Sequence, residues 1–214
     1  MSGAEILFIR HGVTDWNQAR RFQGQIDIEL NEEGRQQARL TSKRLASMAI
    51  AAVYSSDLSR ARQTAEPIAR ALGLELRLEP GLRERSYGMF EGRTHDDLLR
   101  DHPEAYSRWR SRDLAFELPG GGESLLVLRE RVRLQMRRLV DRHSGERVVA
   151  VTHGGVLDTI YRIATGEPAD TVRRFELFNA GINRVGWNGE RFEVLGWGDV
   201  SHLQASLDDI EARD

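Results

Sequence analysis

Two segments with the same pattern decide the fold: ILFIRHG at residues 6–12 and VVAVTHGG at residues 148–155. In each segment, four apolar residues of the kind that fill a buried parallel strand lead through one polar residue to a histidine and a glycine. A strand that only returned to solvent would more often end in Asn, Asp, Ser or Pro. Both strand ends are therefore candidates for a ligand site, with His11 and His153 at its centre.

Strand and helix patterns alternate along most of the chain. Helical spacing of apolar residues is seen at residues 31–48, 58–72 and 123–143. Asn31 is placed to cap the first of these helices, and Gly73 follows the second at the position that ends a helix. The alternation predicts an α/β fold, a three-layer αβα sandwich with a mostly parallel central sheet. Ligands of such sheets bind at the carboxyl ends of the strands.

The end of the chain and one internal segment depart from this alternation. Residues 173–197 alternate aromatic and apolar side chains, with Asn188 and Gly189 as a turn, so we expect strands joined by a hairpin. Residues 101–122 show no clear period, and we interpret them as an irregular excursion over the sheet edge.

Composition excludes several classes of function. With 31 Lys and Arg against 33 Asp and Glu, the net charge is −2, so no long-range field favours nucleic acid or an anionic membrane. The absence of cysteine excludes disulfides and thiolate metal sites. No apolar run approaches the roughly 18 residues of a membrane span, and the N-terminus lacks the basic start of a signal peptide. We expect a cytoplasmic protein in which any anion site is local.

The residues beside the two histidines favour an anion such as phosphate. Arg10 places a cation next to His11, which lowers the pKa of the imidazole and leaves it neutral and able to attack a phosphoryl group. A hydrogen-bonded structural histidine is the alternative for this dipeptide alone. Arg60 and Arg62 open the helix after a third strand end and point to different faces, so only one should meet the site, and we favour Arg60.

A metal site built from the two histidines and a carboxylate is an alternative interpretation of the same residues. We expect no metal, because the arginines of the same pocket would repel a divalent cation and the sequence has no HxH or HExxH spacing.

Motifs along most of the chain resemble the histidine phosphatase superfamily, which includes the cofactor-dependent phosphoglycerate mutases. In chain order they are RHGVTDWN with RFQG, LNEEGRQQA, SSDLSRARQTA, LRERSYGMFEG, PGGGES and THGG. The resemblance implies a phosphoglycerate mutase-like fold in a single domain, residues 1–214, with a variable cap near 93–122 and no cofactor. Phe90 stands where the family often has Trp, and we expect it to alter the pocket wall.

Carried over residue by residue, the resemblance makes His11 the nucleophile that becomes phosphohistidine and Glu84 the proton donor, with His153 a third catalytic residue. It implies a phosphate-binding set of Arg10, Asn17, Arg60 and His153. It also implies substrate-binding roles for Gln23, Gly24 and Tyr87. Without the resemblance, Glu84 would be expected in a surface salt bridge with Arg83 or Arg85.

We expect a metal-independent phosphomonoesterase of the histidine acid phosphatase type that hydrolyses a small phosphorylated metabolite. The alternatives are a cofactor-dependent phosphoglycerate mutase and a non-catalytic module that binds phosphorylated ligands. Mutases of the family resemble one another in a long insertion ahead of the GGES-like segment, whereas here 27 residues separate Gly92 from Gly120. Tyr87 in ERSYG, by contrast, resembles the mutases' own sequence.

Two further points stay open at this stage. Arg108, Arg110 and Arg112 lie in the cap and could either meet a second acidic group of the substrate or be solvated. The aromatic-rich end of the chain could pack on its own sheet or form a homodimer.

Overall fold

A computed structural model describes residues 3–203 of the chain. Within this part no helix combines the length and the apolar character needed to cross a membrane. The strands are β1 (Ala4–Arg10), β2 (Ala52–Ser55), β3 (Leu76–Leu78), β4 (Arg147–Thr152), β5 (Ile182–Trp187) and β6 (Phe192–Asp199). They form one sheet in the order β3-β2-β4-β1-β5-β6, in which β1 to β4 run parallel and β5 is antiparallel to both β1 and β6. The prediction of a mostly parallel sheet with a terminal hairpin is confirmed.

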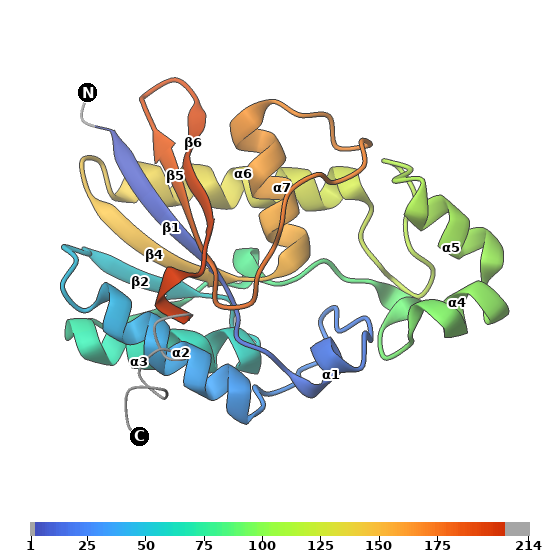
Figure 1. Cartoon of the computed structure of the whole chain (residues 1–214). Helices are drawn as coiled ribbons and strands as arrows, with labels where there is room; N and C mark the ends of the chain where they lie inside the picture. The colour runs from blue at the N-terminus through green and yellow to red at the C-terminus, as the bar shows by residue number, and fades with distance from the viewer. Residues whose placement is uncertain (1–2, 204–214) are drawn as a thin grey trace.

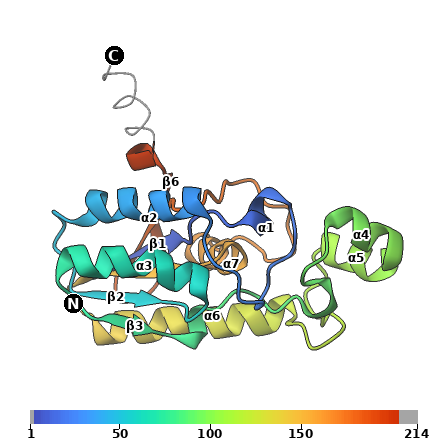
Figure 2. The same ribbon diagram turned by 90° about the horizontal axis from the view of Figure 1, so that it is seen from below.

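Helices cover both faces of the sheet, which confirms the three-layer architecture (Figures 1 and 2). One face carries α2 (Glu32–Leu45) and α3 (Ser59–Leu72), and the other carries α6 (Leu125–Arg142) and α7 (Gly154–Thr165). Successive side chains of β1 pack against the two helical layers alternately, because side chains alternate between the faces of a strand. Ile6 and Phe8 pack with α6 and α7, whereas Leu7 and Ile9 pack with α2 and α3.

The two long helices on the α2–α3 face begin and end close to where the sequence places them. The side chain of Asn31 accepts a hydrogen bond from the backbone N–H of Gly34 at 3.0 Å, which caps α2. The α3 helix ends at Leu72, and Gly73 is its C-cap. The φ of Gly73 is 66°, a left-handed conformation that glycine adopts without strain because it has no Cβ. The α2 helix ends at Leu45, earlier than expected, and Met48 packs against the core from the turn that follows.

The prediction of an irregular stretch at 101–122 is wrong for its first half. Two short helices, α4 (His95–Asp101) and α5 (Pro103–Arg110), lie beyond the carboxyl ends of the strands and not over a sheet edge (Figures 1 and 2). Thr94 and Asp97 form a capping box at the start of α4, and Pro103 opens α5, where a missing N–H leaves no hydrogen bond unmade. Both helices are too short for the periodicity of apolar residues to predict them from the sequence.

The prediction of strand structure from residue 173 is also wrong, because residues 173–181 precede β5. This segment crosses the carboxyl ends of the strands, where hydrogen bonds hold it in place. Arg10 donates to the carbonyl of Leu177, and the side chain of Asn179 donates to the carbonyl of His11 at 2.9 Å. The remaining short elements are α1 (Asp15–Gln18) and the 3-10 helices η1 (Pro80–Leu82) and η2 (Gly88–Phe90).

Candidate active site

The parallel pairing of β1 with β4 brings the two histidines together. Arg10 is level with Thr152 in the sheet, so the next residue of each strand, His11 and His153, leaves the sheet at the same place. The backbone N–H of His11 donates to the carbonyl of Thr152 at 2.9 Å. The two imidazole rings lie with their centroids 5.2 Å apart, and both residues are buried.

His11 is held as a neutral imidazole with a defined tautomer. Its Nδ1 lies 2.7 Å from the carbonyl oxygen of Gly12. Because a carbonyl only accepts, Nδ1 carries the hydrogen and Nε2 keeps its lone pair. Burial holds the pKa of His11 well below its usual range, and the charges of Arg60 and then Arg10 add to this effect. The sequence pointed to Arg10 alone, whereas burial is the larger cause.

Of the two arginines that open α3, the structure turns Arg60 toward the histidines. Arg60 is fully buried and donates from Nη1 to the carbonyl of Ile26 at 2.9 Å and from Nη2 to that of Gly24 at 2.6 Å. Burial lowers the pKa of Arg60 to about 10, so the guanidinium remains charged at neutral pH. Arg62 is exposed and pairs with Glu66 on the next turn of the helix.

A pocket of about 290 Å³ at this place gathers most of the residues singled out in the sequence. Its lining includes Arg10, His11, Asn17, Gln23, Gly24, Arg60, Glu84 and Tyr87. Both ring nitrogens of His153 and the Nε atoms of Arg10 and Arg60 are buried and lack a hydrogen-bond partner among residues 3–203. The guanidinium N–H groups and the single N–H of a neutral imidazole need acceptors, and the oxygens of a phosphate would supply them.

Asn17 enters the pocket from the short helix α1. Its Oδ1 accepts from the backbone N–H of Thr14 at 3.0 Å, and the Thr14 hydroxyl accepts from the backbone N–H of Asn17 in return. With Oδ1 occupied, the amide nitrogen is left as a donor beside the two arginines.

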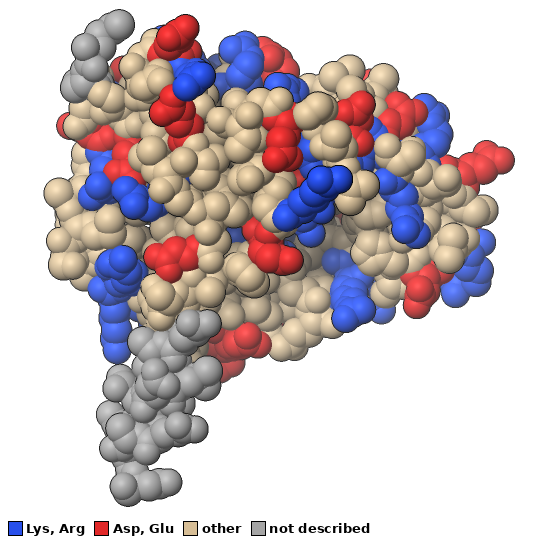
Figure 3. All heavy atoms as spheres, turned by 45° about the horizontal axis from the view of Figure 1, so that its top comes forward, with Lys and Arg blue, Asp and Glu red and all other residues tan. Residues whose placement is uncertain are grey.

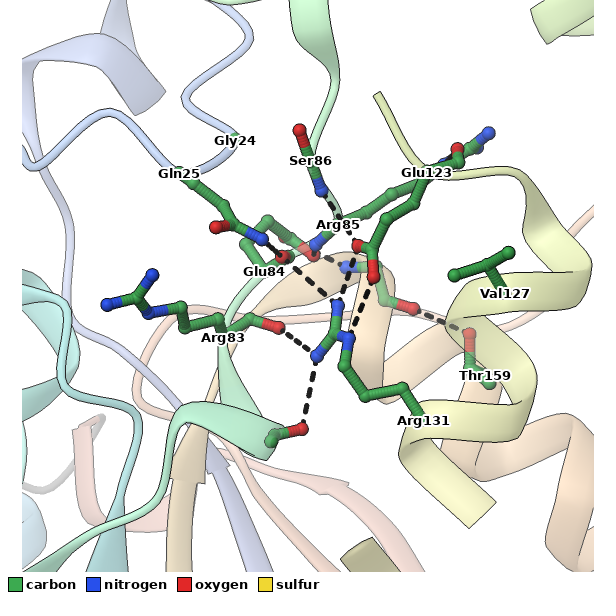
Figure 4. Close-up of polar contacts among 12 residues, drawn as sticks. Gly24, Gln25, Arg83, Glu84, Arg85, Ser86, Glu123, Val127, Arg131 and Thr159 are labelled. Atoms are coloured by element: carbon green, nitrogen blue, oxygen red, sulfur yellow. Dashed lines mark hydrogen bonds and ion pairs between the residues drawn. The ribbon is translucent and has the colours of Figure 1, made fainter. Parts of the chain in front are cut away.

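Glu84 lies opposite, and it does not form the surface salt bridge that its position in the sequence would favour. The residue is 8% exposed; its Oε2 accepts from the backbone N–H of Gly155 at 3.0 Å and its Oε1 from that of Arg85 at 2.8 Å (Figure 4). Arg83 pairs with Asp57, and the Nε of Arg85 donates to the carbonyl of Glu123. The N–H of Gly155 at the start of α7 therefore holds a carboxyl group in place.

A larger cavity of about 750 Å³ adjoins this smaller pocket and shares Arg10, Glu84 and Tyr87 with it. Figure 3 shows a hollow in the surface with basic side chains around it. Tyr87 is half-buried, and desolvation of its phenol raises the pKa, so the hydroxyl stays protonated. The division into a small and a large compartment suits a phosphate with an organic group attached to it.

The three cap arginines have different surroundings. Arg110 and Arg112 line the larger cavity, and Arg112 also pairs with Asp158 at 2.6 Å. Arg108 does not line it and is paired with Asp113.

Phe90 and His95 differ in their relation to the cavities. Phe90 is fully buried with Phe22, Leu98 and Tyr106 and lines neither cavity, so it does not alter the pocket wall as expected. No sequence motif singled out His95, which lines both cavities and has its Nδ1 3.0 Å from the hydroxyl of Tyr106. Recognition of the capping box at Thr94 would have placed His95 at the start of a helix.

Comparison with known proteins gives consistent matches. The sequence profile of the histidine phosphatase superfamily (branch 1) matches residues 6–200. Phosphoglycerate mutase-like protein 4 of Arabidopsis thaliana is 42% identical over 94% of this chain and 87% of its own length. A metal-independent phosphoserine phosphatase of the same plant is also 42% identical, over 94% of this chain and 84% of its own. A phosphoserine phosphatase mutant from Entamoeba histolytica, solved in complex with phosphoserine, has a TM-score of 0.85 at 26% identity and covers 94% and 99% of the two chains.

The buried, neutral state of His11 predicts how stability depends on pH. Because the pKa of His11 is lowered in the folded chain, below a pH of about 6.5 the unfolded chain binds a proton at this residue and the folded chain does not. This difference lowers the free energy of unfolding by up to about 1.4 kcal/mol for each pH unit. The free energy of unfolding should therefore fall as the pH is lowered from 7 to 5, and should fall less in His11→Asn. Denaturant titrations of both proteins at each pH measure this, and parallel curves would contradict a buried neutral His11.

Proposed function

The chain belongs to the histidine phosphatase superfamily, and we propose that it is a phosphomonoesterase that transfers the phosphoryl group of a small metabolite to His11 and then to water. One observation carries the proposal. The imidazole whose Nε2 keeps its lone pair shares a pocket with the buried guanidinium groups of Arg10 and Arg60. A nucleophile and an anion clamp in one pocket are what a covalent phosphoryl transfer requires.

In the first step, Nε2 of His11 attacks phosphorus, a P–N bond forms and the bond from phosphorus to the alcohol oxygen breaks. Glu84 gives its proton to the departing oxygen, for which its place on the wall shared by the two cavities is suited. In the second step the Glu84 carboxylate takes a proton from water, the water oxygen attacks phosphorus and the P–N bond breaks. Inorganic phosphate leaves, and His11 and Glu84 regain their starting states.

Several groups must share the work of this reaction. Hydrolysis of phosphate monoesters is accelerated by up to ~10²¹-fold in enzymes, whereas one charge-assisted hydrogen bond contributes about 1.5–3 kcal/mol. We assign the non-bridging phosphate oxygens to Arg10, Asn17, Arg60 and His153. The two guanidinium charges also disfavour a divalent cation in the pocket, which supports a metal-independent reaction.

Hydrolysis is favoured over the mutase reaction by the size of the cap. A mutase must hold a bisphosphorylated intermediate away from water, and closing segments provide that exclusion. Here the segment between Gly92 and Gly120 consists mainly of the two short helices α4 and α5, so little chain is available to close over the site and exclude water. The relative named a phosphoserine phosphatase supports hydrolysis, whereas the relative named phosphoglycerate mutase-like and the position of Tyr87 beside Glu84 keep a phosphoglycerate mutase as the second candidate.

A phosphohistidine intermediate should be detectable directly. Rapid quenching of a turnover with labelled substrate should leave the label on His11 as an acid-labile, base-stable adduct. His11→Ala should remove activity almost entirely and still fold, and EDTA should leave the wild-type activity unchanged. Label on a serine, or activity that needs an added divalent metal, would overturn the assignment.

The role of Glu84 is tested by the leaving group. Glu84→Gln should slow the hydrolysis of alkyl phosphates far more than that of p-nitrophenyl phosphate, because nitrophenolate departs with little protonation. Steady-state kcat values on the two substrates measure the difference. Equal losses on both would show that Glu84 is not the acid.

The acceptor of the phosphoryl group distinguishes the two candidate functions. With 3-phosphoglycerate as substrate, release of inorganic phosphate should outpace formation of 2-phosphoglycerate, and 2,3-bisphosphoglycerate should not be required. Strong stimulation of the interconversion by that compound, with little phosphate released, would establish the mutase instead.

A further inference from the structure

Glu84 lies on a loop, between η1 and η2, and not on a helix or strand. A proton donor must keep its distance to the leaving oxygen within a few tenths of an ångström, and a loop does not provide this by itself. The two main-chain N–H groups that meet its carboxyl oxygens fix the tip of the side chain. Something else must fix the backbone from which that side chain starts.

Arg131 reaches this backbone from α6 (Figure 4). Its Nη1 donates to the carbonyl of Gly81 at 3.1 Å and to that of Arg83 at 2.8 Å. Its Nη2 donates to the carbonyl of Glu84 itself at 3.3 Å. One guanidinium therefore holds the chain that leads into Glu84 at three of its carbonyl groups.

Glu123 extends this grip to the other side of Glu84. Arg131 binds its carboxylate with two bonds, from Nε to Oε1 at 2.8 Å and from Nη2 to Oε2 at 2.7 Å. The same Oε2 accepts from the backbone N–H of Ser86 at 2.9 Å. The pair thus holds the main chain both before and after Glu84, and Figure 4 shows it between the loop and α6.

We propose that Arg131 and Glu123 form a clamp that positions the carboxyl of Glu84 for proton transfer. The inference rests on the proposed role of Glu84 as the acid. Neither clamp residue lines the phosphate pocket or the larger cavity, so they act through Glu84 and not on the substrate. Their side chains are only 22% and 16% exposed, so this ion pair is not one of the solvated surface pairs that add little to stability.

The shape of the guanidinium is essential to the clamp. Arg131 uses all three of its nitrogens, and a lysine ammonium cannot reach carbonyls and a carboxylate in that fixed fork. Displacement of a catalytic group by 1 Å can cost about a hundredfold in rate. The loss should be concentrated in reactions that depend on protonation of the leaving oxygen.

The test compares Arg131→Met with Arg133→Met, a control on the same helix whose half-exposed guanidinium pairs with Glu130. Arg131→Met should lower kcat for an alkyl phosphate at least about tenfold more than kcat for p-nitrophenyl phosphate, with KM for both little changed. Arg133→Met should match the wild type. Arg131→Lys should behave like Arg131→Met. Burial is the main cause of the low pKa of His153 and the charge of Arg131 is the smallest of several contributions, so the loss of that charge would affect both substrates alike.

A double-variant cycle shows whether the clamp acts through the acid. In a Glu84→Gln background, Arg131→Met should add no further selectivity against the alkyl phosphate, because the group that it positions is already absent. Equal losses on the two substrates for Arg131→Met, or a selectivity that adds to that of Glu84→Gln, would overturn the proposal.

Two further comparisons keep the outcome decisive. If circular dichroism shows Arg131→Met to be unfolded, Glu123→Gln takes its place, with the same selective loss expected and the same equal loss contradicting the clamp. If Glu84→Gln itself shows no selectivity, the proposed acid is wrong. Selectivity in Glu84→Gln with none in Arg131→Met or Glu123→Gln would reject the clamp alone and leave the proposed function standing.

Discussion

The parallel register between β1 and β4 is the constraint on which the rest of the site depends. It sets Arg10 level with Thr152, so that His11 and His153 emerge together where the two strands end. Both faces of the sheet are buried, and a slip of one residue would send every core side chain to the wrong layer. The same packing that specifies the fold therefore also specifies the pairing of the two histidines.

One electrostatic cause has two chemical consequences in this pocket. Burial and the guanidinium charges hold the pKa of both histidines well below the usual range, which leaves a lone pair available for attack on phosphorus. The same charges attract phosphate and disfavour metal ions. Burying Arg60 is costly, and the carbonyls of Gly24 and Ile26 offset part of that cost by accepting two of its N–H groups.

Glu84 and His153 are joined through the start of α7. Gly155, whose N–H holds Glu84, follows His153 by two positions, and an added Cβ there would lie 2.6 Å from the Glu84 carboxyl. Gly12 has a similar part on the other side, where a Cβ would meet the carbonyl of Gly34 at 2.6 Å. Its lack of a side chain allows close approach to α2.

The sequence by itself determined the layers of the fold, since periods of two and 3.6 residues report which side chains are buried, and its ordered motifs were enough to place the chain in its family. Helix geometry alone indicated that only one of Arg60 and Arg62 would meet the site, and the structure shows that it is Arg60. Only the tertiary structure decided the partners of Glu84, the contrast between Arg108 and Arg112, and the presence of His95 in both cavities. The physical reason is range: periodicity is a local property, whereas these contacts join segments that meet only after the sheet has formed, and neither α4 nor α5 is long enough to carry a periodic signal of its own.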